Sequence, residues 1–279
     1  MGELKGLVEA VTGKDLITGE DLAAWERMIG IIPYVSDVGK LIHKAGDLAR
    51  AVEAGSDAAK AAAASGDAKK ALEAAEAANT AEKILEDAGV SLPEGTKQAV
   101  DEAQELARQA GYQEVLTNVP GTTEEQLRNL SRQSNDLIDL IEQEIRGGHS
   151  IARHGSHLTP DDLQQRVLGT HPTLPQARSA LRFANDQVHY DSVNQAFRYH
   201  EADIRTHFAS GGGPNSWSFD YGQPTGEGFY NNPNLGGTRK NPVLEPIPLG
   251  ATTRIRIAFV PDATAPDGFR LVSAFPEYP

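Results

Sequence analysis

Alanine makes up 16 of the 38 residues from Ala51 to Ala88, mixed with glutamate, lysine and aspartate. Alanine has the highest helix propensity but buries little apolar area, so this tract predicts slender helices rather than a broad core. Residues 96–111 and 123–146 predict two further helices. We interpret residues 56–146 as an alanine-rich helical spacer without catalytic groups, with breaks at Gly55, Gly66, Gly89 and Pro93.

Residues 1–55 predict an amphipathic helical hairpin. Apolar residues recur at helical spacing between Leu22 and Ile32, and again between Val38 and Leu48. Pro33 interrupts the pattern and marks the expected corner. A packing face with no further role is the commonest meaning of such stripes.

The second half of the chain begins at Gly147-Gly148 and differs in texture. A helix is expected after Thr159, which offers an N-cap followed by proline and two acids, and ends near Gly169. A longer helix is expected over residues 186–208. Residues 209–250 are rich in glycine, proline and asparagine, so loops are expected to dominate there.

Two segments near the end of the chain, residues 253–260 and 269–275, alternate apolar and polar side chains with period 2. Pro261-Asp262 and Pro266-Asp267-Gly268 supply turn residues between them, so the pair predicts an antiparallel hairpin. The predicted fold class is therefore α+β. An all-helical N-terminal region precedes a small α+β C-terminal domain that ends in this hairpin.

The formal net charge is −13, and residues 1–146 carry 15 Lys/Arg against 27 Asp/Glu. Residues 147–279 carry 11 against 12, so they lack the strong basic footprint that is usual in RNA-binding proteins. The absence of cysteine excludes disulfides and thiolate zinc sites. No run of 18 apolar residues and no signal peptide is visible, so we expect no stable membrane insertion.

Seven of the eight histidines lie between His149 and His207. The densest group is His149, His154 and His157, with Arg153 among them. Two imidazoles and a cation are what cleavage of RNA through its own 2′-hydroxyl needs: a base, an acid and a stabiliser of the phosphorane charge. The alternative is a solvated loop with one or two hydrogen-bonded histidines.

Other polar residues have competing interpretations. A metal site is disfavoured, because the histidine spacing differs from His-x-x-x-His and no acid lies between His149 and Pro160. His189, His200 and His207 lie in the predicted long helix, where His200 is expected to be buried. Arg254 and Arg256 share a strand face that suits an anionic strand. Lys240 is a surface residue by default, or a phosphate contact.

Part of residues 1–55 resembles the pre-toxin TG region found upstream of toxin domains in bacterial polymorphic toxins. The resemblance rests on Thr12-Gly13-Lys14-Asp15, Thr18-Gly19, the Trp25-Glu26-Arg27 helix and Ile31-Ile32-Pro33.

Residues 147–279 resemble the RNase A-like toxin domain of contact-dependent growth inhibition proteins. The segments that carry this resemblance are Gly147–His154, the helix with Leu163 and Arg166, Ser179–Phe183 and Gly268–Pro276. The resemblance implies a metal-independent ribonuclease with a kidney-shaped α+β fold and no cofactor.

The same resemblance assigns roles to residues of this sequence. It makes His149 or His154 the general base or acid, and Arg166, or else Arg153, the charge stabiliser. Ser273 takes the place of the family's threonine. The family's tyrosine two residues later is Phe275 here, which removes a hydroxyl. Tyr278 is near enough in sequence to replace it, although strand alternation places Tyr278 on the opposite face.

The sequence thus predicts three regions: a pre-toxin region (1–55), a helical spacer (56–146) and a toxin domain (147–279). We expect a secreted antibacterial effector, delivered by a secretion apparatus or as part of a larger polypeptide. It would cleave RNA, tRNA foremost, in the cytoplasm of competitor cells and be blocked by a cognate immunity protein. The alternatives are a metal-dependent or EndoU-type nuclease toxin and a non-enzymatic binding or scaffold module.

Overall fold

The computed structural model of the chain describes residues 38–87, 89–130, 138–231, 241, 245–263, 265 and 267–278. The chain forms two compact units, Met1–Glu114 and Val115–Pro279. The pre-toxin motif residues, Pro33 and Lys240 lie outside the described residues. The boundary at Glu114 differs from the boundary expected at Gly147, and the assignment of residues 147–279 as the toxin domain stays a prediction.

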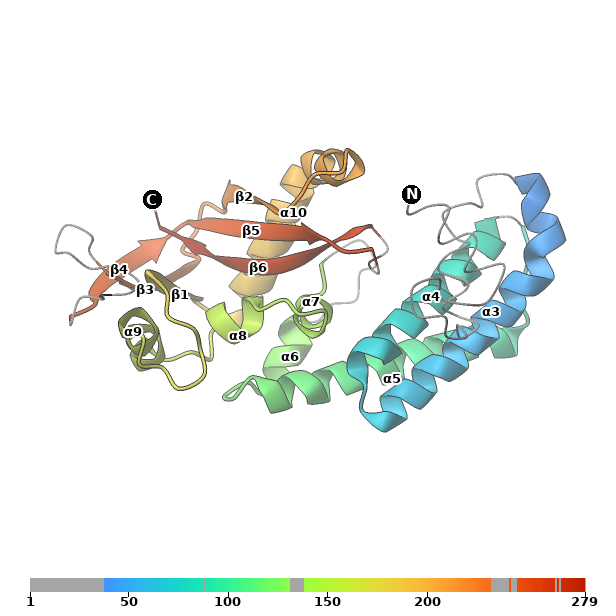
Figure 1. Cartoon of the computed structure of the whole chain (residues 1–279), viewed down its shortest axis with the longest axis horizontal. Helices are drawn as coiled ribbons and strands as arrows, with labels where there is room; N and C mark the ends of the chain where they lie inside the picture. The colour runs from blue at the N-terminus through green and yellow to red at the C-terminus, as the bar shows by residue number, and fades with distance from the viewer. Residues whose placement is uncertain are drawn as a thin grey trace. The chain divides into compact units, whose positions relative to one another are not determined.

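In the first unit, α3 (Val38–Ser65) and α4 (Ala68–Asp87) form a helical hairpin, and α5 (Glu94–Asn118) follows (Figure 1). Gly66, at φ +79°, ends α3, and the Asp67 carboxylate accepts the Lys70 N–H at the start of α4. A break was predicted at Gly55, but α3 continues through this residue. Its missing side chain lets the helices approach closely, because a Cβ there would lie 3.1 Å from the Ala78 Cβ.

Small side chains form much of the core of this unit. One buried cluster consists entirely of alanines from α3, α4 and α5, and a second adds larger residues such as Val52, Leu85 and Val100. The alanine tract therefore packs as close-fitting helices, as its composition predicts.

The second unit begins with short helices. The helix predicted over residues 123–146 is interrupted: α6 spans Glu124–Leu130 and α7 spans Leu140–Ile145. Asp139 begins α7 as an N-cap in extended conformation, and its carboxylate accepts the N–H groups of Ile141 and Glu142. An N-cap side chain satisfies the free N–H groups at a helix start, so a new helix begins here.

Two three-stranded antiparallel sheets form the centre of the second unit. One has the order β1-β3-β4 and the other β2-β5-β6. The strands are β1 (Ser179–Phe183), β2 (Asn215–Asp220), β3 (Gly226–Tyr230), β4 (Ile247–Thr252), β5 (Arg254–Pro261) and β6 (Phe269–Glu277). The predicted β5–β6 hairpin is confirmed, and so is the α+β fold class.

Strands β2, β3 and β4 lie in the segment where loops were expected to dominate. Their glycine and proline content conceals them, since Gly226 and Gly228 form part of β3 and Pro248 lies in β4. A Cβ at Gly228 would lie 2.1 Å from the Ala180 carbonyl oxygen on β1, so glycine is needed there for close pairing of the strands.

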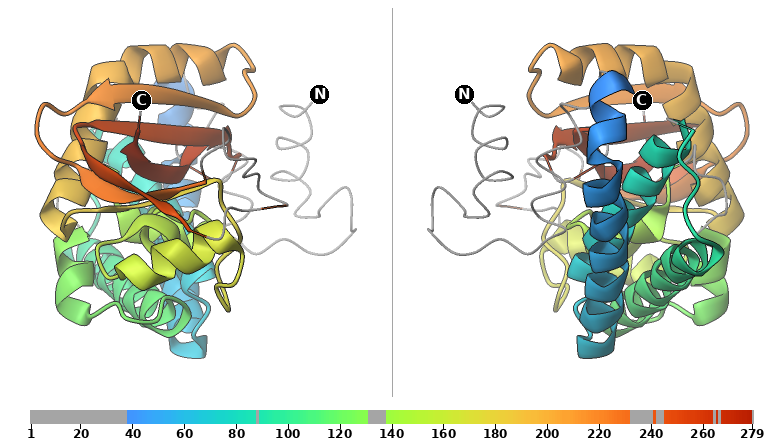
Figure 2. Two further views of the ribbon diagram at one scale, coloured as in Figure 1. Left: turned by 90° about the vertical axis from the view of Figure 1, so that its left-hand side faces the viewer. Right: turned by 90° about the vertical axis from the view of Figure 1, so that its right-hand side faces the viewer.

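Helices cover these sheets. Helix α10 (Asp186–Ala209) crosses the β2-β5-β6 sheet (Figure 2). Phe197 of this helix packs on Phe259 of β5. Helix α9 (Pro160–Leu168) packs on β1, with Leu163 and Val167 buried against Ala180. The short helix α8 (Ser150–His154) contacts both β1 and β6.

Candidate functional site

The turn that leads into α8 is fixed by glycines and by one carboxylate. Gly147 has φ +88°, and a Cβ on Gly148 would lie 2.5 Å from the Gln143 carbonyl oxygen. The Glu144 carboxylate accepts the N–H groups of Ile151 and Ala152, both at 2.9 Å. Burial raises the pKa of Glu144, while these hydrogen bonds and Arg153 oppose the rise. The two glycines and the Glu144 carboxylate together therefore fix the conformation of the Gly147–Ala152 segment.

Ser150 attaches α8 to the edge of β6. Its hydroxyl donates to the Ala274 carbonyl at 3.0 Å and accepts the Ala274 N–H at 3.3 Å. Because its single proton is then used, the contact with His189 Nε2 at 2.8 Å is a donation from the imidazole. His189 is fully buried and stacks on Phe183 with ring centroids 3.9 Å apart. Burial lowers its pKa to about 3, so it is neutral and has a structural role.

His154 is buried and oriented at the end of α8. Its Nδ1 lies 2.8 Å from the Leu181 carbonyl oxygen, and its ring lies 5.2 Å from that of Phe275 on β6. Burial, followed by the charge of Arg166, holds the pKa of His154 well below its usual value. The imidazole is therefore neutral. Since a carbonyl oxygen only accepts, Nδ1 bears the proton and Nε2 bears the lone pair.

His149 lies just before α8 and is half-buried. Its backbone N–H donates to the Val272 carbonyl at 3.0 Å, while its side chain makes no capping hydrogen bond. Partial burial lowers the pKa of His149 to about 4, and the positive charges of Arg153, Arg166 and Arg270 contribute. This imidazole is thus neutral at pH 7 and surrounded by cations.

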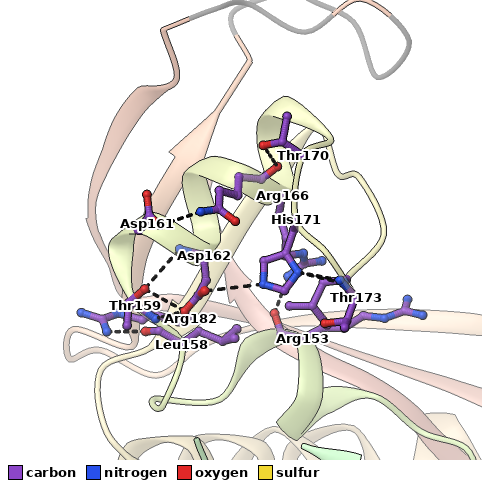
Figure 3. Close-up of polar contacts among 12 residues, drawn as sticks. Arg153, Leu158, Thr159, Asp161, Asp162, Arg166, Thr170, His171, Thr173 and Arg182 are labelled. Atoms are coloured by element: carbon purple, nitrogen blue, oxygen red, sulfur yellow. Dashed lines mark hydrogen bonds and ion pairs between the residues drawn. The ribbon is translucent and has the colours of Figure 1, made fainter. Parts of the chain in front are cut away.

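Arg166 reaches from α9 toward α8 (Figure 3). Its side chain is only 3% exposed, and its Nη1 donates to the backbone carbonyl of Arg153. Its Nε is buried without a hydrogen-bond partner among the described residues. Burial, and then Arg153, lower the pKa of Arg166 to about 10, so the guanidinium still carries its charge at neutral pH. A buried arginine without a carboxylate partner is unusual in a stable core.

A separate network fixes the helix that carries Arg166. Thr159 and Asp162 form a capping box at the start of α9, and the His171 Nε2 lies 3.5 Å from the Asp162 carboxylate (Figure 3). His171 Nδ1 accepts the N–H groups of Thr173 and Leu174. The predicted N-cap is confirmed, and His171 acts in this network as a structural residue.

Strand β6 places Ser273 next to α8. Val272 is a bulge residue, because Ala258 pairs with Ser273 and Phe259 pairs with Leu271. After the bulge, Ser273 and Phe275 share one face of the strand, and Phe275 contacts His154. The Ser273 residue is 6% exposed. Tyr278 lies beyond the end of β6 and is 50% exposed, with no contact to α8 or α9 among the described interactions.

The remaining candidate residues have structural partners. Arg256 and Arg254 both lie within ion-pair distance of the single Glu277 carboxylate, which offsets part of the positive charge on the strand face that was expected to suit an anionic strand. His200 is half-buried rather than buried, and its Nε2 lies 3.1 Å from the Ser218 carbonyl oxygen. His189 is the fully buried histidine of α10.

The structure therefore brings together His149, Arg153, His154 and Arg166 beside the β6 strand that carries Ser273, and leaves Tyr278 apart. Sequence reasoning missed Arg270, whose charge acts on His149. The period-2 pattern of β6 contains the signal, since it places Arg270 on the face opposite to Phe269 and Leu271. Within the described ranges, no group of three or more His, Asp or Glu side chains is arranged to hold a metal ion.

The described helices include none with the length and apolar character required to cross a membrane. No curated protein sequence matches the chain. Among solved structures, the chain is similar to a chain of a CdiA-CT/CdiI complex from Y. kristensenii 33638. That likeness has 21% identity and a TM-score of 0.36, and covers 47% of this chain and 100% of the other. Residues 1–62 match the family model described as Pre-toxin TG, which confirms the resemblance seen in the N-terminal motifs.

Proposed function

We propose that this chain is a secreted antibacterial effector whose residues 147–279 cleave RNA without a metal ion. The observation that carries the proposal is a neutral, oriented His154 under the charge of the buried Arg166, a guanidinium that has no carboxylate partner among the described residues. The Pre-toxin TG match supports the effector context, because that region precedes toxin domains. An oriented base beside an unneutralised cation is what transphosphorylation of RNA requires.

In the proposed reaction, His154 Nε2 removes the proton from a ribose 2′-hydroxyl. The 2′-oxygen attacks the adjacent phosphorus, and the bond from phosphorus to the 5′-oxygen breaks. The products are a 2′,3′-cyclic phosphate and a 5′-hydroxyl. Arg166, with Arg153 beside it, offsets the negative charge that develops on the phosphorane oxygens. The His149 imidazolium donates the proton to the leaving 5′-oxygen.

The acid role of His149 depends on substrate binding. Its pKa of about 4 in the free protein reflects partial burial and three nearby positive charges. A bound phosphodiester brings a negative charge that counters those cations, so it raises the pKa of His149. We therefore expect the fraction of competent enzyme, and the rate of cleavage, to increase as the pH is lowered from 8 toward 6.

Two further side chains complete the proposed site. The Ser273 hydroxyl lies on the β6 face next to His154 and is a donor for a phosphate oxygen. Tyr278 is the tyrosine nearest to Phe275 in sequence, and we propose it as a contact for the substrate at the exposed end of β6. Its role requires RNA to extend along the strand.

The proposal includes the context of action. The effector would be delivered by a secretion apparatus or as part of a larger polypeptide, and would act on RNA, tRNA foremost, in the cytoplasm of the target cell. The producing cell needs a cognate immunity protein. An acidic surface complementary to Arg153, Arg166 and Arg270 is its simplest form.

The test compares purified full-length protein with His154→Ala, His149→Ala and a control, His207→Ala, on total RNA with and without EDTA. His207 is a matched histidine whose Nε2 contacts the Gly213 carbonyl, near the exposed end of α10. We expect cleavage that persists in EDTA, yields 2′,3′-cyclic phosphate ends, and falls about 100-fold or more in His154→Ala. His207→Ala should cleave like the wild type.

Other outcomes separate the alternatives. Cleavage that stops in EDTA would indicate a metal-dependent nuclease, and loss of cleavage in Lys240→Ala would favour an EndoU-type enzyme. If expressing cells stop growing while their RNA stays intact, the protein is a toxin but RNA is not its substrate. Normal growth with intact RNA would favour a binding or scaffold module.

A further inference from the structure

We infer that Arg270 of β6 is a further phosphate-binding residue, so that the site takes a phosphodiester between guanidinium groups from α9 and β6. The inference rests on the proposed ribonuclease function, and it adds a residue that the histidine cluster and the C-terminal motif do not identify. Four observations carry it: the position of Arg270, its ion pair, its free donors, and the matching state of Arg166.

The position of Arg270 is beside the turn that carries His149. Its Nη2 lies 3.8 Å from the place that a Cβ of Gly147 would occupy. Two residues along the strand, the Val272 carbonyl accepts the His149 N–H at 3.0 Å. The guanidinium of Arg270 therefore lies next to the Gly147–His149 turn, on the side of β6 that faces α8.

A single ion pair orients this guanidinium. The Nε of Arg270 lies 3.2 Å from the Asp262 carboxylate, and these side chains are 20% and 15% exposed. Asp262 is fixed in turn at the end of the hairpin, where its backbone N–H donates to the Gly268 carbonyl at 2.9 Å. The carboxylate thus contacts the guanidinium at Nε, while Nη2 lies near the turn at Gly147.

Arg270 retains donors that the protein does not use. Its Nη1 is buried and has no hydrogen-bond partner among the described residues. Arg166, which is 3% exposed, has a buried Nε in the same state. Two guanidinium groups, one from α9 and one from β6, thus have donors without a hydrogen-bond partner among the described residues, and the charges of both act on His149.

A phosphodiester is the ligand that this arrangement fits. Guanidinium groups bind phosphate through parallel N–H donors, and an anion with several acceptor oxygens satisfies donors that come from two directions. His149 is partly exposed, so an anion can approach its imidazole from solvent. The same anion reduces the repulsion among Arg153, Arg166 and Arg270.

The experiment measures binding of inorganic phosphate and of a 2′-deoxy dinucleotide, which cannot be cleaved, to the full-length protein. Calorimetry gives the affinity, and NMR titration gives the pKa of His149. Arg270→Gln should bind the dinucleotide about tenfold to hundredfold more weakly, the loss typical of a charged hydrogen bond. The affinity should also fall less steeply in this variant as the salt concentration rises, because one charge that attracts the anion is removed. Phosphate should raise the pKa of His149 less in this variant than in the wild type.

Arg198→Gln is the matched control, since it removes the same charge from an exposed position on α10. A loss of affinity in Arg270→Gln no larger than that in Arg198→Gln overturns the inference. Arg270→Lys keeps the charge and the contact with Asp262, so it decides the case if Arg270→Gln does not fold by circular dichroism. It should then retain part of the affinity and of the salt dependence.

The experiment also distinguishes this inference from the proposed function. Dinucleotide binding through Arg270 by a protein that leaves RNA intact would support the anion site and reject the ribonuclease. RNA cleavage whose KM and salt dependence are unchanged in Arg270→Gln would support the ribonuclease and reject the role of Arg270.

Discussion

The two compact units bury different kinds of side chain. Among the described residues of the helical unit, the buried polar ones are Ser56 and Thr96, and the Ser56 hydroxyl simply donates to the Val52 carbonyl of its own helix. The second unit has twelve buried polar or charged residues within its described ranges, including Ser150, His154 and Arg166. Ser150 and His154 belong to α8 and Arg166 to α9, so these three lie on the short helices next to the sheets.

This difference suggests different roles for the buried residues: those of the helical unit stabilise its fold, and the polar ones of the second unit include candidates for ligand binding. The described core of the helical unit is stabilised by close packing of small apolar side chains. In the described part of the second unit, Arg166 Nε and Arg270 Nη1 are buried without hydrogen-bond partners. Such groups destabilise a fold by about 1–3 kcal/mol each, so they indicate a site with a function beyond folding.

The largest expected effect separates activity from stability at Arg166. Arg166→Gln should lower kcat/KM for RNA by about 100- to 1000-fold, because the phosphorane loses its charge stabiliser. The same change should leave the free energy of unfolding unchanged or raise it, since a buried charge without a carboxylate partner is removed. Urea unfolding and initial cleavage rates measure the two quantities.

The control for this prediction is Arg182→Gln on β1. Arg182 donates to the Leu158 carbonyl and pairs with Glu227 at 2.9 Å, so its loss should affect stability more than cleavage. If Arg166→Gln instead unfolded the protein while cleaving normally, Arg166 would belong to the core and not to a site.

The second prediction tests the helical unit. Leu85 is fully buried in the cluster with Val52 and Val100, so Leu85→Ala should lower the stability of this unit by about 2–5 kcal/mol. RNA cleavage by the full-length variant should stay at the wild-type rate, since no proposed catalytic group lies there. Differential scanning calorimetry alongside a cleavage assay checks both. A parallel fall in cleavage would mean that the helical unit supports catalysis.

The third prediction uses the depressed pKa of His189. Burial lowers this pKa from 6.5 to about 3. Between pH 6.5 and 3, His189 is therefore protonated in the unfolded chain but stays neutral in the folded protein. Stability should therefore fall by up to about 1.4 kcal/mol per pH unit between 6.5 and 3 from this residue. His149, with a pKa of about 4, adds to the fall over the upper part of the range.

His189→Gln keeps an N–H donor for Ser150 and cannot be protonated, so it should flatten this pH dependence. Urea midpoints at intervals from pH 7 to pH 4 provide the measurement. An unchanged slope in His189→Gln would assign the acid sensitivity to other groups.

The sequence alone predicted the elements whose signals are local. The N-cap at Thr159, the period of α10 and the alternation in β5 and β6 all depend on neighbouring residues, and all were confirmed. Strands such as β3 were missed, because glycine there serves close approach to another strand. Which histidines are buried was also inaccessible, since His189 depends on Phe183 and Ser150. The role of Arg270 could not be predicted for the same reason, because its ion pair with Asp262 forms across the hairpin.

The smallest expected effect concerns Phe275. The resemblance to RNase A-like toxins places a tyrosine at this position, and here the Phe275 ring lies 5.2 Å from that of His154. Phe275 is half-buried, so Phe275→Tyr adds a hydroxyl near the proposed base at a partly exposed position. One further hydrogen bond to the phosphate should raise kcat by about twofold to tenfold, with little change in stability. Single-turnover cleavage of a defined RNA measures the rate, and Tyr278→Phe is the companion variant.

A faster Phe275→Tyr combined with a normal Tyr278→Phe would place the missing hydroxyl on the β6 face with Ser273. The reverse pattern would mean that Tyr278 has taken over the role, and that substrate reaches past the end of the strand.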